Sequence, residues 1–161
     1  MRELPFALAP VTVVVGHYGV GKTNFALNLA LDAAAAGRAV TLADMDVVNP
    51  YFRSSEYAAV LDAAGVRLVA PVFAGAGTSL DVPSLTGAVV PAIQAAYAEA
   101  AAPAPVASGA VGRPLVIIDA GGDDVGATAL ARFAGAIQAG PHEVIYVANA
   151  FRNLTQEPAE A

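Results

Sequence analysis

Cysteine is absent from the 161 residues of this chain, and basic residues are few. Without thiols the chain cannot form disulfides, hold an iron–sulfur cluster through cysteine, build a zinc ribbon or use a cysteine nucleophile. Eight Lys and Arg residues stand against fourteen acidic ones, for a formal net charge of −6. Because the basic residues are spread thinly along the chain, the sequence shows no electrostatic footprint for a nucleic acid or an anionic membrane.

A long uninterrupted hydrophobic run is also lacking, although 57% of the residues are hydrophobic. The uncharged stretch over residues 4–21 is broken by Pro5, Pro10 and Gly16, so it fits neither a membrane span nor a signal peptide. Charged residues make up only 14% of the chain, which excludes a disordered protein. We therefore expect a cytoplasmic protein without a membrane partner, folded as one domain over residues 1–161.

The chain does contain short runs rich in Val and Ile, which alternate with alanine-rich helical stretches. This pattern is typical of parallel strands that helices bury on both faces, and it predicts an α/β fold with a mostly parallel sheet. Strands are predicted at residues 11–15, 39–43, 67–70, 115–118 and 144–148. Helices are predicted at residues 22–36, 55–64, 87–101 and 127–139.

The strongest motif lies between the first predicted strand and the first predicted helix. Its sequence, GHYGVGKT, matches G-x-x-x-x-G-K-[ST], in which backbone N–H groups surround a polyphosphate. Lys22 would contact the β- and γ-phosphates, and the Thr23 hydroxyl would bind Mg²⁺. An accidental glycine-rich turn is the alternative, but it would require motif, strand and helix to coincide. The predicted nucleotide contacts are Gly16, His17, Gly19, Val20, Gly21, Lys22, Thr23 and Asn24.

Asp119 ends the predicted strand 115–118, where a P-loop protein places a carboxylate that holds Mg²⁺ through water. Gly122 completes a D-x-x-G spacing, and its N–H group could reach a γ-phosphate and report the loss of that phosphate on hydrolysis. A cap at the end of a strand is the alternative role for Asp119. The neighbouring Asp123 and Asp124 fit a solvated loop or the N-cap of the next helix.

Asp44 and Asp46 end the second predicted strand and lie on the same side of an extended chain. They stand at the carboxyl edge of the sheet, where ligands of open α/β proteins bind. We expect one of them to orient an attacking water and the other to take part in metal or switch contacts, with Asp46 as the candidate metal ligand. Arg53 could neutralise phosphate charge or form a surface ion pair.

The segments GHYGVGKT, LADMD and VIIDAGGDD, in this order, resemble the nucleotide-binding domain of the MinD/ParA/CobQ–CobB superfamily of P-loop ATPases. The segments DMDVVNPYFR, GGDDVGATALARFA and YVANAFRNLT further resemble bacterial MinD/ParA-like ATP-binding proteins. This resemblance implies a three-layer α/β/α P-loop NTPase fold with strand order 3-2-4-1-5. It also implies Mg²⁺ and ATP binding, slow hydrolysis and often a nucleotide-dependent homodimer. Carried over, it makes Lys22 and Asp44 the catalytic candidates, with Asp44 positioning water and Thr23 and Asp119 holding Mg²⁺.

Two departures from this family are visible. Its members carry a second lysine at the second position of the P-loop, which reaches the nucleotide of the partner subunit; here that position is His17, followed by Tyr18. The His17 side chain could donate a hydrogen bond to phosphate or could pack beside Tyr18. Family members also continue after their fifth strand, so we expect a C-terminal part of the fold to be missing and strand 144–148 to be an edge that favours self-association.

The sequence leaves three functions open. The first is a slow ATPase that acts as a nucleotide switch on a protein partner. The second is an ATP-dependent small-molecule ligase or kinase of the dethiobiotin synthetase or CobQ/CobB type, with a substrate pocket lined by residues 72–86. The third is a non-catalytic nucleotide-binding fragment.

Overall fold

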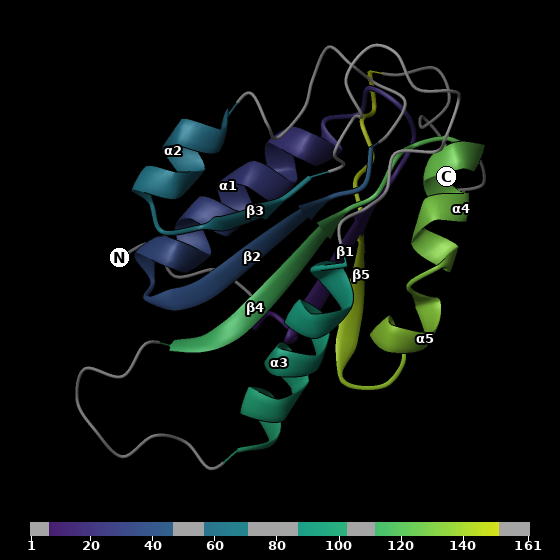
Figure 1. The fold of residues 1–161 in the computed structure, drawn as a ribbon. Helices are drawn as coiled ribbons and strands as arrows, with labels where there is room; N and C mark the ends of the chain where they lie inside the picture. The colour runs from purple at the N-terminus through teal and green to yellow at the C-terminus, as the bar shows by residue number, and fades with distance from the viewer. Residues whose placement is uncertain (1–6, 47–56, 71–86, 103–111, 152–161) are drawn as a thin grey trace, which may run out of the picture.

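The structure, a computed structural model, describes residues 7–46, 57–70, 87–102 and 112–151 (Figure 1). These residues form one five-stranded sheet with helices on both faces. The strands are β1 (Val11–Val15), β2 (Arg38–Asp44), β3 (Arg67–Val69), β4 (Gly112–Asp119) and β5 (His142–Tyr146). The helices are α1 (Lys22–Ala35), α2 (Ala58–Ala63), α3 (Val89–Ala101), α4 (Asp124–Ala131) and α5 (Ala134–Ile137).

The strands are all parallel and lie in the order β3-β2-β4-β1-β5, which confirms the expected order 3-2-4-1-5. Parallel strands need crossover connections, and the helices between them supply these. The order inserts β4 between β1 and β2, although β1 and β2 follow each other in the chain. The carboxyl ends of these three strands therefore meet at the centre of one edge of the sheet, where ligands of open α/β sheets bind.

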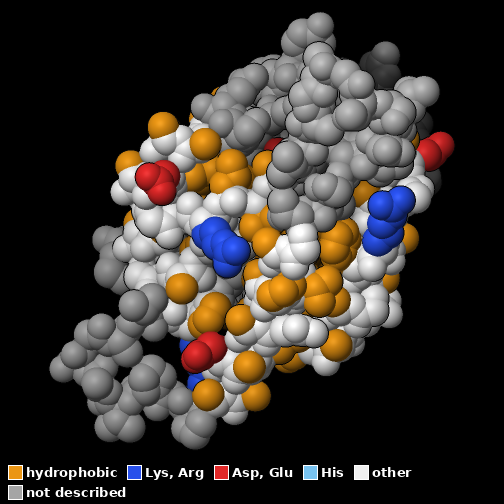
Figure 2. All heavy atoms as spheres, viewed as in Figure 1, with side chains coloured by type: hydrophobic (Ala, Val, Ile, Leu, Met, Phe, Trp, Pro, Cys, Tyr) orange, Lys and Arg blue, Asp and Glu red, His pale blue; other side chains and the backbone are white. Residues whose placement is uncertain are grey.

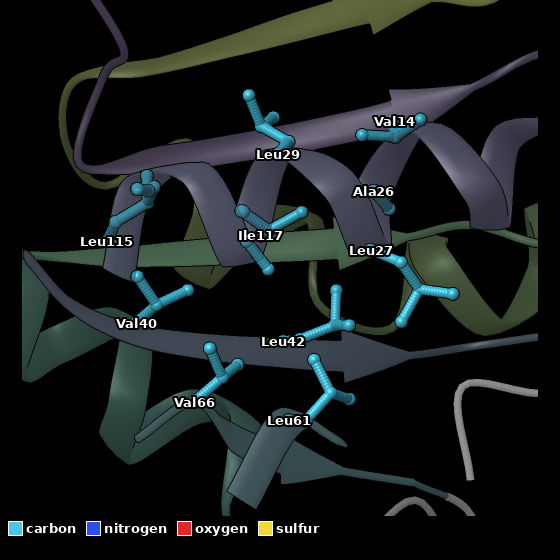
Figure 3. Packing of buried hydrophobic residues seen from close by; sticks show 12 residues of the cluster. Val14, Ala26, Leu27, Leu29, Val40, Leu42, Leu61, Val66, Leu115 and Ile117 are labelled. Carbon is cyan, nitrogen blue, oxygen red and sulfur yellow. The ribbon is translucent and has the colours of Figure 1, made fainter. Parts of the chain in front are cut away.

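Alternate residues of the strands build two separate cores because successive side chains point to opposite faces of a sheet. On β1, Val14 packs into the core under α1 and α2, whereas Val13 packs into the core under α3 and α5. Figure 3 shows the first core, in which Leu29 of α1 and Leu61 of α2 lie with strand residues such as Ile117. Truncation of a fully buried Leu or Ile in such a core to Ala costs about 2–5 kcal/mol.

The surface over the second core is mostly apolar or uncharged. Figure 2 shows hydrophobic side chains in the middle of this face, with Lys, Arg, Asp and Glu side chains scattered singly around them. Helix α3 is rich in alanine and contains a single charged residue, Glu99, so it presents little charge to solvent. Among the helices of the described residues, none has the length and hydrophobicity that a membrane span requires.

The helix predicted over 127–139 is wrong as a single element, because the chain forms two helices there. The first, α4, begins three residues earlier than predicted because the Asp123 side chain caps it, accepting a hydrogen bond from the Gly126 N–H at 2.8 Å. The break follows at Phe133, whose N–H bonds the Leu130 carbonyl at 2.9 Å in a tighter turn. Phe133 packs there against the second core, and α5 starts directly after it.

Two strands begin two or three residues earlier than predicted. β4 starts at Gly112, whose N–H donates to the Gly37 carbonyl at 2.6 Å and extends the pairing with β2. β5 starts at His142 and ends at Tyr146, so the prediction of 144–148 is two residues late. Its pairing with β1 is anchored by Glu143, whose carboxylate accepts hydrogen bonds from the Thr12 hydroxyl at 2.8 Å and the Ala9 N–H at 2.9 Å.

Within the described residues β5 is the outermost strand beside β1, which confirms that it forms an edge of this sheet. Its side chains alternate between exposed and half-buried, and Val144 is 61% exposed. Such an edge favours pairing with another strand. The self-association expected from the sequence stays a prediction.

Of the helix predicted over 55–64, the structure gives α2, while residues 47–56, including Arg53, lie outside the described residues.

Candidate nucleotide-binding site

The glycine-rich loop, residues 16–23, joins the carboxyl end of β1 to the start of α1. Its glycines Gly16, Gly19 and Gly21 have φ values of +147°, +72° and +102°, a backbone region that side chains strongly disfavour. A Cβ atom on Gly16 would also overlap the carbonyl oxygen of Val147, just after β5. The loop can therefore follow this path only because glycine occupies these positions.

Helix α1 begins with its first backbone N–H groups directed into this loop. Gly21 is its N-cap residue, no side chain within the described residues caps it, and its first turn contains no acidic residue. The first N–H groups of a helix lack intrahelical partners, and together with the helix dipole they attract anions. The start of this 14-residue helix is thus suited to a phosphate group.

The Lys22 side chain folds back into the loop. It is only 6% exposed, and its Nζ donates a hydrogen bond to the His17 carbonyl at 3.0 Å. Burial lowers the pKa of Lys22, while the nearby carboxylates of Asp119, Asp46 and Asp123 raise it. The ammonium group is consequently held inside the loop, close to the acidic residues of the neighbouring strands.

Gly122 brings the D-x-x-G segment, residues 119–122, against the glycine-rich loop. A Cβ atom at Gly122 would lie 2.6 Å from the Lys22 Nζ and 2.6 Å from the Tyr18 backbone nitrogen. Real Cβ atoms do not approach other atoms so closely, so any side chain here would push the two segments apart. The structure therefore brings together two motifs that are separated by about a hundred residues in the sequence.

Asp44 and Asp119 lie side by side at the carboxyl ends of β2 and β4. They are direct partners in the parallel register, both are buried, and both stand on the α1 side of the sheet. The Met45 N–H bonds the Asp119 carbonyl at 2.9 Å, and the Asp46 N–H bonds the Asp44 Oδ1 at 3.0 Å. The two acidic sites predicted from the sequence thus form a single cluster of carboxylates beside the loop.

The pKa of Asp119 is strongly raised. Burial above all, together with the charges of Asp44 and Asp46, raises it from 3.8 to about 7, against the opposing effects of Thr23 and Lys22. Thr23 lies near enough to lower this pKa, yet among the described residues neither oxygen of Asp119 has a donor in good hydrogen-bonding geometry. A buried carboxylate in this condition is costly unless another group satisfies it.

A magnesium ion fits this requirement. Mg²⁺ prefers oxygen ligands and is bound by one or two carboxylates together with waters and substrate phosphates. The Asp119 carboxylate and the Thr23 hydroxyl offer such oxygens, with Asp46 near enough to influence the pKa of both Asp119 and Lys22. No three His, Cys, Asp or Glu side chains of the described segments gather closely enough to form a complete metal site, so waters and a phosphate would supply the remaining ligands.

The His17 side chain turns toward β5. Its ring meets the Tyr146 ring edge to face, with centroids 6.5 Å apart and an interplanar angle of 89°. Tyr18, the neighbour considered from sequence, is instead 59% exposed. Tyr146 begins the segment YVANAFRNLT, but no role in the site is predicted for it from the sequence, although its position at the carboxyl end of a strand next to β1 could have indicated one.

A pocket of about 370 Å³ lies beside the loop on the α4 side of the sheet. It shares His17 and Gly122 with the contacts described above, and Tyr146 closes one side. Ala127 and Leu130 of α4, which the sequence did not point to, line another side. The proposed substrate-pocket residues 72–86 lie outside the described residues, so this pocket stands independently of them.

The remaining predicted contacts take ordinary places in the loop and the first turn of α1. Val20 is buried and its N–H faces the His17 carbonyl at 3.4 Å, while Gly19 and Asn24 are exposed.

No protein-family model matches the chain, and no curated protein matches it either. The class of site must therefore be argued from its own residues.

The buried Asp119 predicts an unusual dependence of stability on pH. The folded chain keeps this proton up to about pH 7, whereas an unfolded chain loses it near the ordinary aspartate pKa of 3.8. Folded protein then binds more protons between these values, so the free energy of unfolding of the metal-free protein falls as pH rises from about 4 to 7. This fall amounts to a few kcal/mol. Asp119→Asn should remove it and so flatten this part of the pH profile. Urea unfolding at several pH values measures it, with the exposed Asp62→Asn as control; an unchanged slope would contradict the assignment.

The close approach of Gly122 predicts a steric effect. Gly122→Ala should destabilise the protein by about 1–3 kcal/mol because its Cβ would overlap atoms of the glycine-rich loop. The matched control is Gly135→Ala in α5, where a Cβ meets nothing within 4 Å and alanine favours the helix. Urea denaturation of both variants tests the contact, and equal stabilities would show that the two segments are not packed together.

Proposed function

We propose that the chain is a P-loop NTPase of the three-layer α/β/α type that binds ATP with Mg²⁺. The observation that carries this proposal is the meeting of the glycine-rich loop with a buried Asp119 and with Gly122 at the carboxyl ends of β1 and β4. A ligand that combines anionic oxygens with a cation suits a site in which a lysine and several carboxylates lie close together. The choice of ATP as the nucleotide is supported by the resemblance to MinD/ParA-like proteins.

Each residue of the site has a definite task in this proposal. The N–H groups at the start of α1 surround the phosphates, and the Lys22 Nζ exchanges its bond to the His17 carbonyl for the β- and γ-phosphates. Thr23 and Asp119 would hold Mg²⁺, with Asp46 as a further ligand. When bound, this ion would neutralise phosphate charge during phosphoryl transfer.

Charge balance supports a requirement for the metal ion. Asp119, Asp46 and Asp123 lie near enough to Lys22 to raise its pKa, and Asp44 is the register partner of Asp119, so a polyphosphate entering without a cation would meet net repulsion. Asp44 stands on β2, one strand further from β1 and the glycine-rich loop than Asp119 on β4. We assign to Asp44 the positioning of the water that attacks the γ-phosphate.

A slow ATPase that works as a switch on a protein partner is the leading function. Gly122 supports it because this residue touches both Lys22 and the Tyr18 backbone, so a change at the γ-phosphate would reach the D-x-x-G segment directly. Such a switch often works as a homodimer in the family that the sequence resembles. Its partner would recognise the state of residues 121–124, which line the pocket at the start of α4.

The pocket beside the loop favours a second candidate, an ATP-dependent ligase or kinase that acts on a small molecule. It lies next to Gly122 and His17, and its volume of about 370 Å³ suits a metabolite. ATP hydrolysis without any acceptor supports the switch, whereas ADP release that depends on a metabolite supports the ligase. ATP binding without either activity supports the non-catalytic alternative.

Lys22→Ala tests the binding site. The substitution should weaken Mg²⁺–ATP binding by at least about tenfold, because a charge-assisted hydrogen bond contributes roughly 1.5–3 kcal/mol. Calorimetric titration gives the dissociation constants, and Arg67→Ala, which removes an exposed cation on β3, is the matched control. Equal affinity of the wild type and Lys22→Ala would overturn the proposed P-loop.

Asp44→Asn separates catalysis from binding. The amide keeps the shape of the side chain but loses its negative charge, so ATP binding should change little. The rate of hydrolysis should fall by roughly 10²–10⁴-fold if the carboxylate positions or activates water. Single-turnover phosphate release measures this rate, with Asp62→Asn as control for a lost surface charge. A normal rate in Asp44→Asn would assign the water to another residue.

A further inference from the structure

The first half of the glycine-rich loop rests on the end of β5. Val15 and Tyr146 are partners in the parallel register, and the Val147 N–H donates to the Val15 carbonyl at 2.8 Å. Directly after this bond, Gly16 lies so close to the Val147 carbonyl that a Cβ could not fit. The path of the loop as it leaves β1 is therefore set by the backbone of the strand next to it.

His17 connects this support to the lysine of the loop. On one side its ring contacts the Tyr146 ring edge to face, an arrangement that aromatic pairs favour. On the other side its carbonyl accepts the hydrogen bond from the Lys22 Nζ at 3.0 Å. Any displacement of His17 would move the oxygen that holds the ammonium group inside the loop.

We propose that Tyr146 is a positioning residue for the nucleotide site, acting through His17 on the loop and on Lys22. The role assigned to Lys22 rests on the proposed function, but the contacts that position it are those of the protein without nucleotide. A ring at position 146 fixes His17 before ATP binds, so the loop loses less conformational entropy on binding. Loss of the ring leaves the loop with more conformations and weakens binding.

The position of Tyr146 makes this role separable from stability. The residue is 42% exposed and ends an outer strand, so it is not part of either buried core. Val144 lies on the same face of the same strand, two residues earlier, and is more exposed still. Its truncation perturbs β5 in a similar way without touching His17, which makes Val144→Ala the matched control.

The experiment is a double-mutant cycle on the full chain. Tyr146→Ala should weaken Mg²⁺–ATP binding about two- to tenfold, the range expected for one aromatic pair. Tyr146→Phe, which keeps the ring, and Val144→Ala should bind within about twofold of the wild type. Because Tyr146 acts through His17, adding Tyr146→Ala to His17→Ala should cause no further loss. Urea unfolding of each variant shows whether stability alone explains the change.

A second measurement needs no nucleotide. In the ATP-free protein, NMR signals from the backbone amides of the loop, including those of Gly21 and Lys22, should shift in Tyr146→Ala and stay in place in Tyr146→Phe and Val144→Ala. If these shifts occur but no variant or wild-type protein binds ATP, the proposed function fails and the positioning role stands. If the loop amides do not respond, or if Tyr146→Ala and His17→Ala weaken binding additively, Tyr146 does not position the loop.

Discussion

The parallel pairing of β4 between β1 and β2 is the constraint on which the site depends. Val14 and Asp44, on two different strands, both have Asp119 as their register partner. A shift of β4 by one residue would turn the Asp119 side chain to the opposite face of the sheet, away from α1. It would also turn Ile117 and Leu115 out of the first core. The burial of these apolar side chains thus holds the carboxylate in place.

The same burial makes the site unfavourable without a ligand. Asp119 and Asp44 are taken out of water next to each other, and Lys22 is buried nearby with its ammonium directed to a backbone carbonyl. Each of these groups would be easier to accommodate at the surface. Polar groups that break the usual rules of a buried core in this way cluster at functional sites. A cation with a polyphosphate would satisfy the lysine and the carboxylates together. Binding of such a ligand would therefore offset the free-energy cost of burying these charged groups.

The sequence predicts the order of strands and helices well because each buried strand is a short Val/Ile run. It places β1 and the start of α1 correctly, since the glycine-rich motif separates a Val-rich run from a helical pattern that starts at Lys22. The start of α4 depends on a cap by Asp123, which the sequence allowed only as one of two roles. The break at Phe133 follows from packing against the second core, which a helical period does not reveal.

Some residues of the candidate site can likewise be identified from the sequence, whereas others become visible only in the fold. Motif spacing identifies Lys22, Asp44 and Asp119 because they are close to recognisable segments of the chain. It assigns no role to Tyr146, because the contact between its ring and that of His17 arises only once β5 pairs with β1. Nor does spacing show that Gly122 contacts the backbone of Tyr18, because that contact depends on how the end of β4 meets the loop.

These contacts give the two sides of the glycine-rich loop different properties. On the β5 side, a backbone hydrogen bond from Val147 and the close fit of Gly16 tie the loop to a strand of the sheet. On the other side, Gly122 lies against Tyr18 and Lys22 in a segment between β4 and α4 that pairs with no strand of the described sheet. In the function that we propose, a ligand that draws Lys22 away from the His17 carbonyl would alter the Gly122 contact more readily than the β5 contact. A response to a bound phosphate would then pass to residues 120–124 and α4.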